Sequence, residues 1–190
     1  GDLAVAVYHD DSNYGMLTSV RIFGKGRRGG NYSIQNGFGG IYSLAYDNNG
    51  NLFADGTQCG ESECYEPAYY QPALFELQSY SRSFEPIEVT GADLHNPSGL
   101  AWINPTLLLT DNLSSRPVGY KLLVSGSTAK VVATVPFATA QSVGGIMVRA
   151  GQIILPDRVG NEILTYDLKT GALESSFNVQ QPFDAVLSQK

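Results

Sequence analysis

The stretch from Ser142 to Phe177, SVGGIMVRAGQIILPDRVGNEILTYDLKTGALESSF, decides the fold. It contains four short apolar runs separated by turns that contain glycine: residues 146–148, 152–156, 162–166 and 172–177. Alternation in the third run places Ile163 and Thr165 on one face and Leu164 and Tyr166 on the other. Short alternating runs bounded by Gly, Asp and Asn are typical of strands in an antiparallel meander. A four-stranded meander of about 40 residues is the blade of a β-propeller.

The same pattern recurs through the rest of the chain. Repeats are predicted at residues 38–92 and 93–138, and the opening stretch belongs to a repeat at residues 139–180. Residues 1–37 and 181–190 together supply the strands of one more blade. The prediction is therefore an all-β chain, with residues 1–190 forming one β-propeller domain of about four antiparallel blades. The alternatives are a fragment of a six- to eight-bladed propeller, or two chains that share one eight-bladed ring.

The two ends of the chain are predicted to close the ring. The first strand, Gly1 to Tyr8, has no partner strand before it, and the last, Phe183 to Leu187, has none after it. Unpaired strand edges template aggregation, and closing the ring would remove them. We therefore expect Phe183–Leu187 to pair with Leu3–Val7.

Composition and charge restrict the possible partners and compartment. The chain of 190 residues carries a net charge of −6, and DNA or RNA phosphates would repel such a surface. No apolar run reaches the roughly 20 residues that a membrane span requires. Cys59 and Cys64 lie close together, which favours a disulfide in a secreted, extracellular or periplasmic protein, although two free thiols are the alternative.

An acidic residue closes the second strand of three repeats: Asp55, Asp111 and Asp157, at spacings of 56 and 46 residues. If these carboxylates converge at one rim of the channel, they could hold Ca²⁺ or another divalent metal through hard oxygen ligands. The alternative is that each carboxylate accepts backbone N–H groups from the turn that it closes. A residue repeated in every blade usually serves the blade, so we expect the structural role and no cofactor.

The most individual segment is the insertion Gly56–Gln71, which interrupts the second repeat. Loops that depart from a repeat often carry function, and tyrosines supply contact area at little entropic cost. The candidate binding residues of this loop are Glu61, Glu63, Tyr65, Glu66, Tyr69 and Tyr70. Outside the loop, His9 and His95 are the two histidines, and no recognised catalytic motif places either of them beside a nucleophile.

The sole tryptophan, Trp102, lies in the predicted first strand of the third repeat. Alternation places Leu100 and Trp102 on the same face of that strand. We expect this face to pack between neighbouring blades.

Local sequences in two repeats resemble the NHL and SMP-30/gluconolactonase-like group of propellers. The matching stretches are Leu155-Pro156-Asp157, Gly160–Ile163, Tyr166–Gly171 and Asn96–Ala101. In lactonase-like members, the resemblance implies a channel metal held by Glu, Asn and Asp from different blades, but no first strand of this chain opens with the Glu.

Two functions remain open from the sequence. The first is a non-catalytic propeller that binds a protein or glycan, or that self-associates as a building block. The alternative is a lactonase- or lyase-like enzyme with a divalent metal in the central channel. The absence of a recognisable acid/base set in the sequence favours the first.

Overall fold

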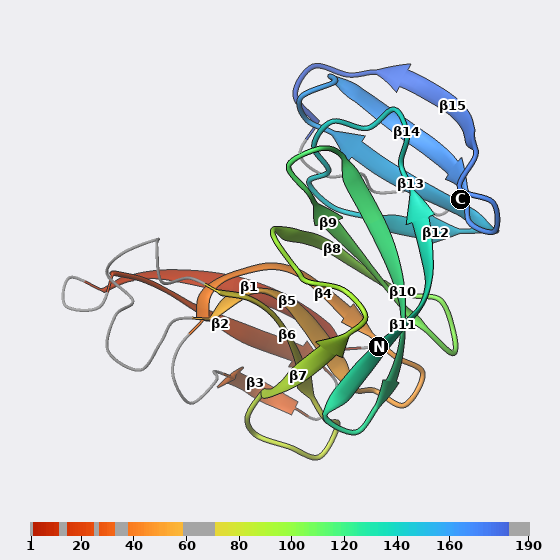
Figure 1. The fold of residues 1–190 in the computed structure, drawn as a ribbon. Coiled ribbons are helices and arrows are strands. Elements are labelled where there is room, and N and C mark those ends of the chain that lie inside the picture. The colour runs from red at the N-terminus through yellow and green to blue at the C-terminus, as the bar shows by residue number, and fades with distance from the viewer. Residues whose placement is uncertain (1, 12–14, 25–26, 33–37, 59–70, 183–190) are drawn as a thin grey trace.

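The computed structural model describes residues 2–11, 15–24, 27–32, 38–58 and 71–182. Every helix or strand assigned in these residues is a β-strand (Figure 1). For reference, we group the strands in chain order into four sets and call them blades 1 to 4. Blade 1 contains β1 (Leu3–Asp11), β2 (Gly15–Gly24) and β3 (Arg27–Tyr32). Blade 2 contains β4 (Phe38–Tyr46), β5 (Leu52–Gln58), β6 (Gln71–Leu77) and β7 (Glu85–Thr90). Blade 3 contains β8 (Pro97–Trp102), β9 (Leu107–Asn112), β10 (Pro117–Ser125) and β11 (Thr128–Pro136). Blade 4 contains β12 (Met147–Arg149), β13 (Gln152–Asp157), β14 (Glu162–Asp167) and β15 (Leu173–Asn178).

The meander predicted from the opening stretch is confirmed in blade 4. Its strands pair antiparallel in sequence order, from β12 to β15. Ala150 and Gly151 occupy the first turn with positive φ angles of 51° and 81°, which glycine adopts without strain. Leu164 and Tyr166 are buried towards blade 3, as the alternation indicated.

Blade 1 contains a long β-hairpin. The β1–β2 ladder extends from the Leu3–Phe23 pair to the polar Asp11–Gly15 pair. The glycine- and arginine-rich β3 pairs with the other edge of β2. Backbone hydrogen bonds hold these ladders and do not require apolar side chains.

The proposed closure of the ring lies outside the described residues, because Phe183–Leu187 are not among them. Within the described part, β1 pairs with β2 and with no other strand. The face of β1 and β2 that points away from blade 2 carries Leu3, Val5 and Phe23, which are all exposed. No helix capable of crossing a membrane occurs among the described residues.

Three apolar cores fill the spaces between consecutive blades. The core between blades 1 and 2 contains Val20, Ile22, Ile41, Leu52, Ala54 and Phe75. The core between blades 2 and 3 contains Phe53, Leu74, Ile87, Leu100, Leu107 and Leu109. The core between blades 3 and 4 contains Leu108, Val135, Phe137, Ile153, Leu155 and Tyr166. Successive residues of β5 and of β9 therefore serve two different cores, as the two-residue period of a strand requires.

The packing predicted for Trp102 is confirmed. Its ring stacks on Phe53 of blade 2, with ring centroids 6.0 Å apart and an angle of 5° between the planes. Leu100, on the same face of β8, is buried in the same core. Trp102 therefore joins blade 3 to blade 2.

Strand β7 leaves its own blade halfway along its length. Its first residues pair with β6, but only from Leu74–Ile87 to Glu76–Glu85. Residues 88–90 pair instead, in parallel, with residues 128–130 of β11. The N–H of Glu88 also donates to the carbonyl of Ser127 over 2.9 Å. This crossing joins blades 2 and 3. A single pair between β2 and β4, Thr18–Phe38, adds blade 1 to give one 11-stranded sheet, whereas blade 4 forms its own four-stranded sheet.

Candidate functional site

Asp111 uses its carboxylate to fix the segment that enters its own blade. The backbone N–H of Asn96 donates to Oδ1 over 2.6 Å, and that of His95 donates to Oδ2 over 3.0 Å. Asp111 is fully buried, and these two N–H groups precede β8 in the chain. A buried carboxylate needs such charge-assisted hydrogen bonds, because they replace the water that it has lost.

Asp157 has the same role in blade 4. Its carboxylate accepts the backbone N–H groups of Gln141 over 2.8 Å and of Ser142 over 3.0 Å. It also accepts the N–H of Gly160, over 3.0 Å, in the turn that follows β13. The structure thus favours the structural reading of both aspartates, although most of the donors lie before the blade and not in the turn that the carboxylate closes.

Asp55 does not occupy the position of the other two aspartates, and the predicted equivalence is wrong. Asp111 shares its face of β9 with Leu107 and Leu109, which pack towards the preceding blade. Asp55 shares its face of β5 with Phe53, which packs towards the following blade. A shift of one residue along a strand reverses the side that a residue faces.

The residue of blade 2 that matches Asp111 is Gly56. It follows Leu52 and Ala54 on the face towards blade 1. A Cβ atom at Gly56 would overlap the carbonyl oxygen of Gly40 in β4. No side chain fits there, so blade 2 lacks this carboxylate.

Asp55 is a fully buried carboxyl group with one free oxygen. Its Oδ1 accepts the backbone N–H of Ser43 over 2.6 Å and the Ser43 hydroxyl over 2.8 Å. Its Oδ2 is buried and has no hydrogen-bond partner among the described residues. Burial raises the pKa of Asp55 to about 7, and the hydrogen bonds from Ser43 oppose this shift. Such a group can hold a proton at neutral pH, but it is enclosed between the blades and touches no open surface.

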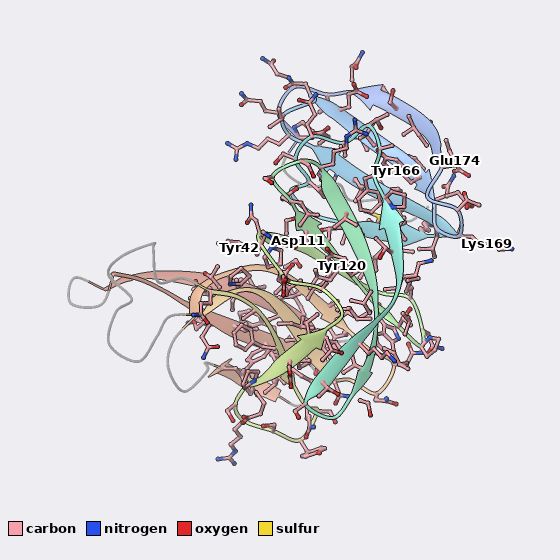
Figure 2. All side chains as sticks on the ribbon, viewed as in Figure 1. Tyr42, Asp111, Tyr120, Tyr166, Lys169 and Glu174 are labelled. Atoms are coloured by element: carbon pink, nitrogen blue, oxygen red, sulfur yellow. The ribbon has the colours of Figure 1, made fainter. Side chains whose placement is uncertain are left out.

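The three aspartates do not converge on a common point. In the described ranges, no three His, Cys, Asp or Glu side chains form a group that could hold a metal ion. Asp111 (Figure 2) and Asp157 direct their oxygens at backbone donors, and Asp55 directs one oxygen at the backbone N–H and hydroxyl of Ser43. The described residues therefore do not fit the channel metal that the family resemblance implied.

His95 lies beside Asp111 at the surface. Its Nδ1 is 3.9 Å from Oδ2 of Asp111 and forms a 2.9 Å hydrogen bond with the carbonyl of Asp93. The imidazole side chain is 59% exposed, whereas Asp111 is inaccessible. Nearby, burial raises the pKa of Tyr120, and the negative charges of Asp111 and Asp93 raise it further. His95 thus continues the structural network of Asp111. The other histidine, His9, lies in β1 opposite Leu17.

The candidate binding loop falls outside the described residues. Its six candidates are Glu61, Glu63, Tyr65, Glu66, Tyr69 and Tyr70. Cys59 and Cys64, the predicted disulfide pair, also fall outside. These predictions stand as they were made from the sequence.

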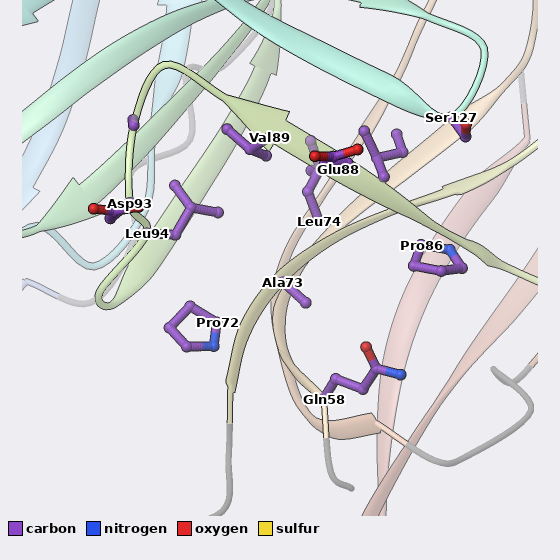
Figure 3. A pocket seen from close by; sticks show the side chains of 12 residues that line it. Gln58, Pro72, Ala73, Leu74, Pro86, Glu88, Val89, Asp93, Leu94 and Ser127 are labelled. Carbon is purple, nitrogen blue, oxygen red and sulfur yellow. The ribbon is translucent and has the colours of Figure 1, made fainter.

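The structure shows a groove that the sequence did not indicate (Figure 3). It has a volume of about 580 Å³ and lies where β7 diverges from β6. Apolar side chains of both strands line it, together with the carboxylates of Glu88 and Asp93. Gln58, the residue before the undescribed loop, is also part of the lining. The groove follows from the crossing of β7 to β11, and no local sequence signal marks that crossing.

Comparison with known proteins establishes the fold. No family model and no curated protein matches the sequence. Among solved structures, the chain is similar to a gluconolactonase from Xanthomonas campestris, with a TM-score of 0.60 at 11% identity, covering 91% of this chain and 61% of that one. It is similar to a streptogramin B lyase, with a TM-score of 0.56 at 14% identity, covering 93% of this chain and 55% of that one. A chain of a nidogen/laminin complex gives a TM-score of 0.51 at 13% identity, covering 91% of this chain and 75% of that one.

These similarities confirm the resemblance to NHL and SMP-30-like β-propellers at the level of the fold. The chain spans less than two thirds of the length of the first two structures. The three similar structures include two enzymes and one binding protein, and a fold shared at such low identity does not carry an activity with it.

Proposed function

We propose that the protein is a non-catalytic β-propeller module that binds a protein or glycan partner, or other copies of itself, in an extracellular or periplasmic setting. The observation that carries the proposal is the groove between β6 and β7. Its volume of about 580 Å³ lies within the usual range of binding sites, about 300–1,000 Å³. Its lining combines an apolar floor with a few charged groups, which is also typical of such sites.

The structural use of the aspartates supports the same proposal. Asp111 and Asp157 accept two or more backbone hydrogen bonds each, so their oxygens are engaged in holding the blades. A carboxylate engaged in this way is a poor metal ligand or general base. The nidogen/laminin neighbour shows that this architecture also occurs in a protein complex.

A variant that fills the groove tests the proposal. Ala92 lines the groove, and Ala92→Trp should block it with little effect on the buried cores. Val159 is 58% exposed in blade 4, so Val159→Trp adds the same indole far from the groove. Partners found on glycan and protein arrays should be lost with Ala92→Trp and retained with Val159→Trp. A partner that binds both variants equally would contradict the assignment of the groove.

The second candidate function is a lactonase- or lyase-like enzyme with a divalent metal in the channel. One observation favours it: two of the three similar structures, the gluconolactonase and the streptogramin B lyase, are enzymes. Metal analysis of the purified protein, together with a lactone hydrolysis assay, distinguishes the two functions. A stoichiometric divalent ion together with lactone hydrolysis would replace the binding function with the enzymatic one.

A further inference from the structure

The charged side chains that line the groove are all negative. Its charged members are Glu88 and Asp93, both exposed, and no Lys, Arg or His side chain is part of its described lining. In the view of Figure 3, the two carboxylates lie at the upper rim on either side of Val89. Ionised carboxylates only accept hydrogen bonds, so this rim suits a ligand that only donates them.

Below this rim the floor is apolar. Leu74 and Ile87 are buried, and Val89 and Leu94 are half-buried. A ligand that fills the groove must therefore combine an apolar body with a positively charged, donor-only end. Lysine and arginine side chains have this construction, because a methylene stem carries an ammonium or guanidinium group. A glycan hydroxyl both donates and accepts, and so it matches the lining less well.

Two prolines restrict backbone hydrogen bonding between the groove and a ligand. The edge of β6 at residues 71–73 has no strand partner on the side of β7 in the described structure. Such an edge could accept an added strand, but Pro72 and Pro86 lack the N–H groups that a new ladder would need. The ligand is therefore held by its side chains more than by backbone pairing.

We propose that this groove binds a lysine or arginine side chain presented by a protein partner. The inference rests on the proposed binding function and names the partner: a protein with an exposed basic segment. The methylene stem of the guest packs on the half-buried Val89 and Leu94, and its charged end lies between Glu88 and Asp93. The net charge of −6 over the whole chain favours the approach of such a segment.

The test is a titration of the ¹⁵N-labelled protein, followed by amide NMR, with the peptide acetyl-Ala-Leu-Lys-Leu-Ala-amide. Matched peptides carry norleucine, which keeps the stem without the charge, or glutamate in place of lysine. We expect saturable shifts at the amides of Ile87, Val89 and Leu94 with the lysine peptide. The norleucine peptide should bind about fivefold more weakly, which corresponds to about 1 kcal/mol, and the glutamate peptide should not bind.

Charge-neutral variants complete the test. The double variant Glu88→Gln, Asp93→Asn should remove the preference for lysine over norleucine, whereas Glu162→Gln, which removes a carboxylate in blade 4, should leave it intact. Equal binding of the lysine and norleucine peptides to the unmodified protein would overturn the inference. Amide chemical shift changes confined to other blades would also overturn the inference. If n-butylammonium alone binds as tightly as the peptide, the ligand is a free amine and the protein partner is wrong.

These results can be separated from a failure of the proposed function. If Ala92→Trp abolishes binding of a partner, but the unmodified protein shows no preference for lysine over norleucine, the proposed binding function is supported. Only the inference that the groove binds a basic side chain is then wrong. A stoichiometric metal with lactone hydrolysis would instead remove the binding function itself.

Discussion

At the scale of single residues, Asp55 makes the stability of the protein depend on pH. Its pKa in the folded protein is about 7, whereas an unfolded aspartate has a pKa of about 3.9. Between these values the folded state holds a proton that the unfolded state has released. The contribution of this group to the free energy of unfolding should therefore be highest below about pH 4, should fall as the pH rises from about 4 to about 7, by roughly 4 kcal/mol in total, and should then level off.

Asp55→Asn should remove this contribution. The variant should match the unmodified protein at about pH 3.5 and exceed it in stability at pH 8, because asparagine carries no charge to bury. Urea unfolding at the two pH values measures the difference, and Asp93→Asn, at an exposed position, is the matched control. Parallel pH profiles for Asp55→Asn and the unmodified protein would show that the carboxyl group is ionised in the folded state.

Trp102 is the second residue with a defined energetic role. Replacing it with alanine removes the stack on Phe53 and leaves a cavity in the core between blades 2 and 3. We expect Trp102→Ala to lower the free energy of unfolding by about 3–5 kcal/mol, measured by chemical denaturation. Trp102→Phe should recover part of this loss. A native fluorescence maximum typical of fully exposed tryptophan would contradict the packing.

At the scale of elements, the contact between β4 and β5 depends on Gly56. Gly56→Ala should push the two strands apart, because the new Cβ would overlap the carbonyl of Gly40. The expected cost is at least about 2 kcal/mol of unfolding free energy. Gly126→Ala is the control: the Cβ there meets open space, and only its φ of 59° disfavours a side chain, at about 1 kcal/mol. Equal costs for the two variants in thermal unfolding would show that β4 and β5 adjust without strain.

The elements also show what the sequence can predict. The strands of blade 4 could be predicted from apolar runs bounded by glycine-containing turns, because both the strands and their turns are local features of the sequence. The prediction treated Asp55 as equivalent to Asp111 and Asp157, but its side chain lies on the opposite face of its strand. An aspartate at the end of a strand does not by itself show which face of the strand it occupies. Its neighbour Gly56 carried the missing signal: counting in twos from Leu52 and Ala54 reaches the glycine and not Asp55.

The crossing of β7 could not be predicted from its sequence. Residues 85–90, EPIEVT, alternate in the same way as any half-buried strand. The partner of an alternating strand is chosen by residues distant in the sequence, here residues 128–130 of β11. The groove depends on that choice, and so the sequence offered no sign of it.

At the scale of the whole molecule, the closure of the ring remains a prediction. We expect removal of residues 181–190 to destabilise the protein and to cause aggregation, because β1 would lose its predicted partner. Removal of Gln189 and Lys190 alone should have little effect. Light scattering and chemical denaturation of the two truncated chains measure this, and unchanged stability of the shorter chain would show that the ends do not pair.

The parallel ladder between β7 and β11 has a mechanical consequence. It joins the outer strands of blades 2 and 3, which the chain otherwise connects only through the segment between β7 and β8. Under tension applied at the two ends of the chain, these blades share the load and should yield together. A pulling experiment on single molecules would then record one long extension for residues 38–136, and blade 4, which forms a separate sheet, should give a shorter step of its own. The strand crossing would thus set the size of the unit that resists force.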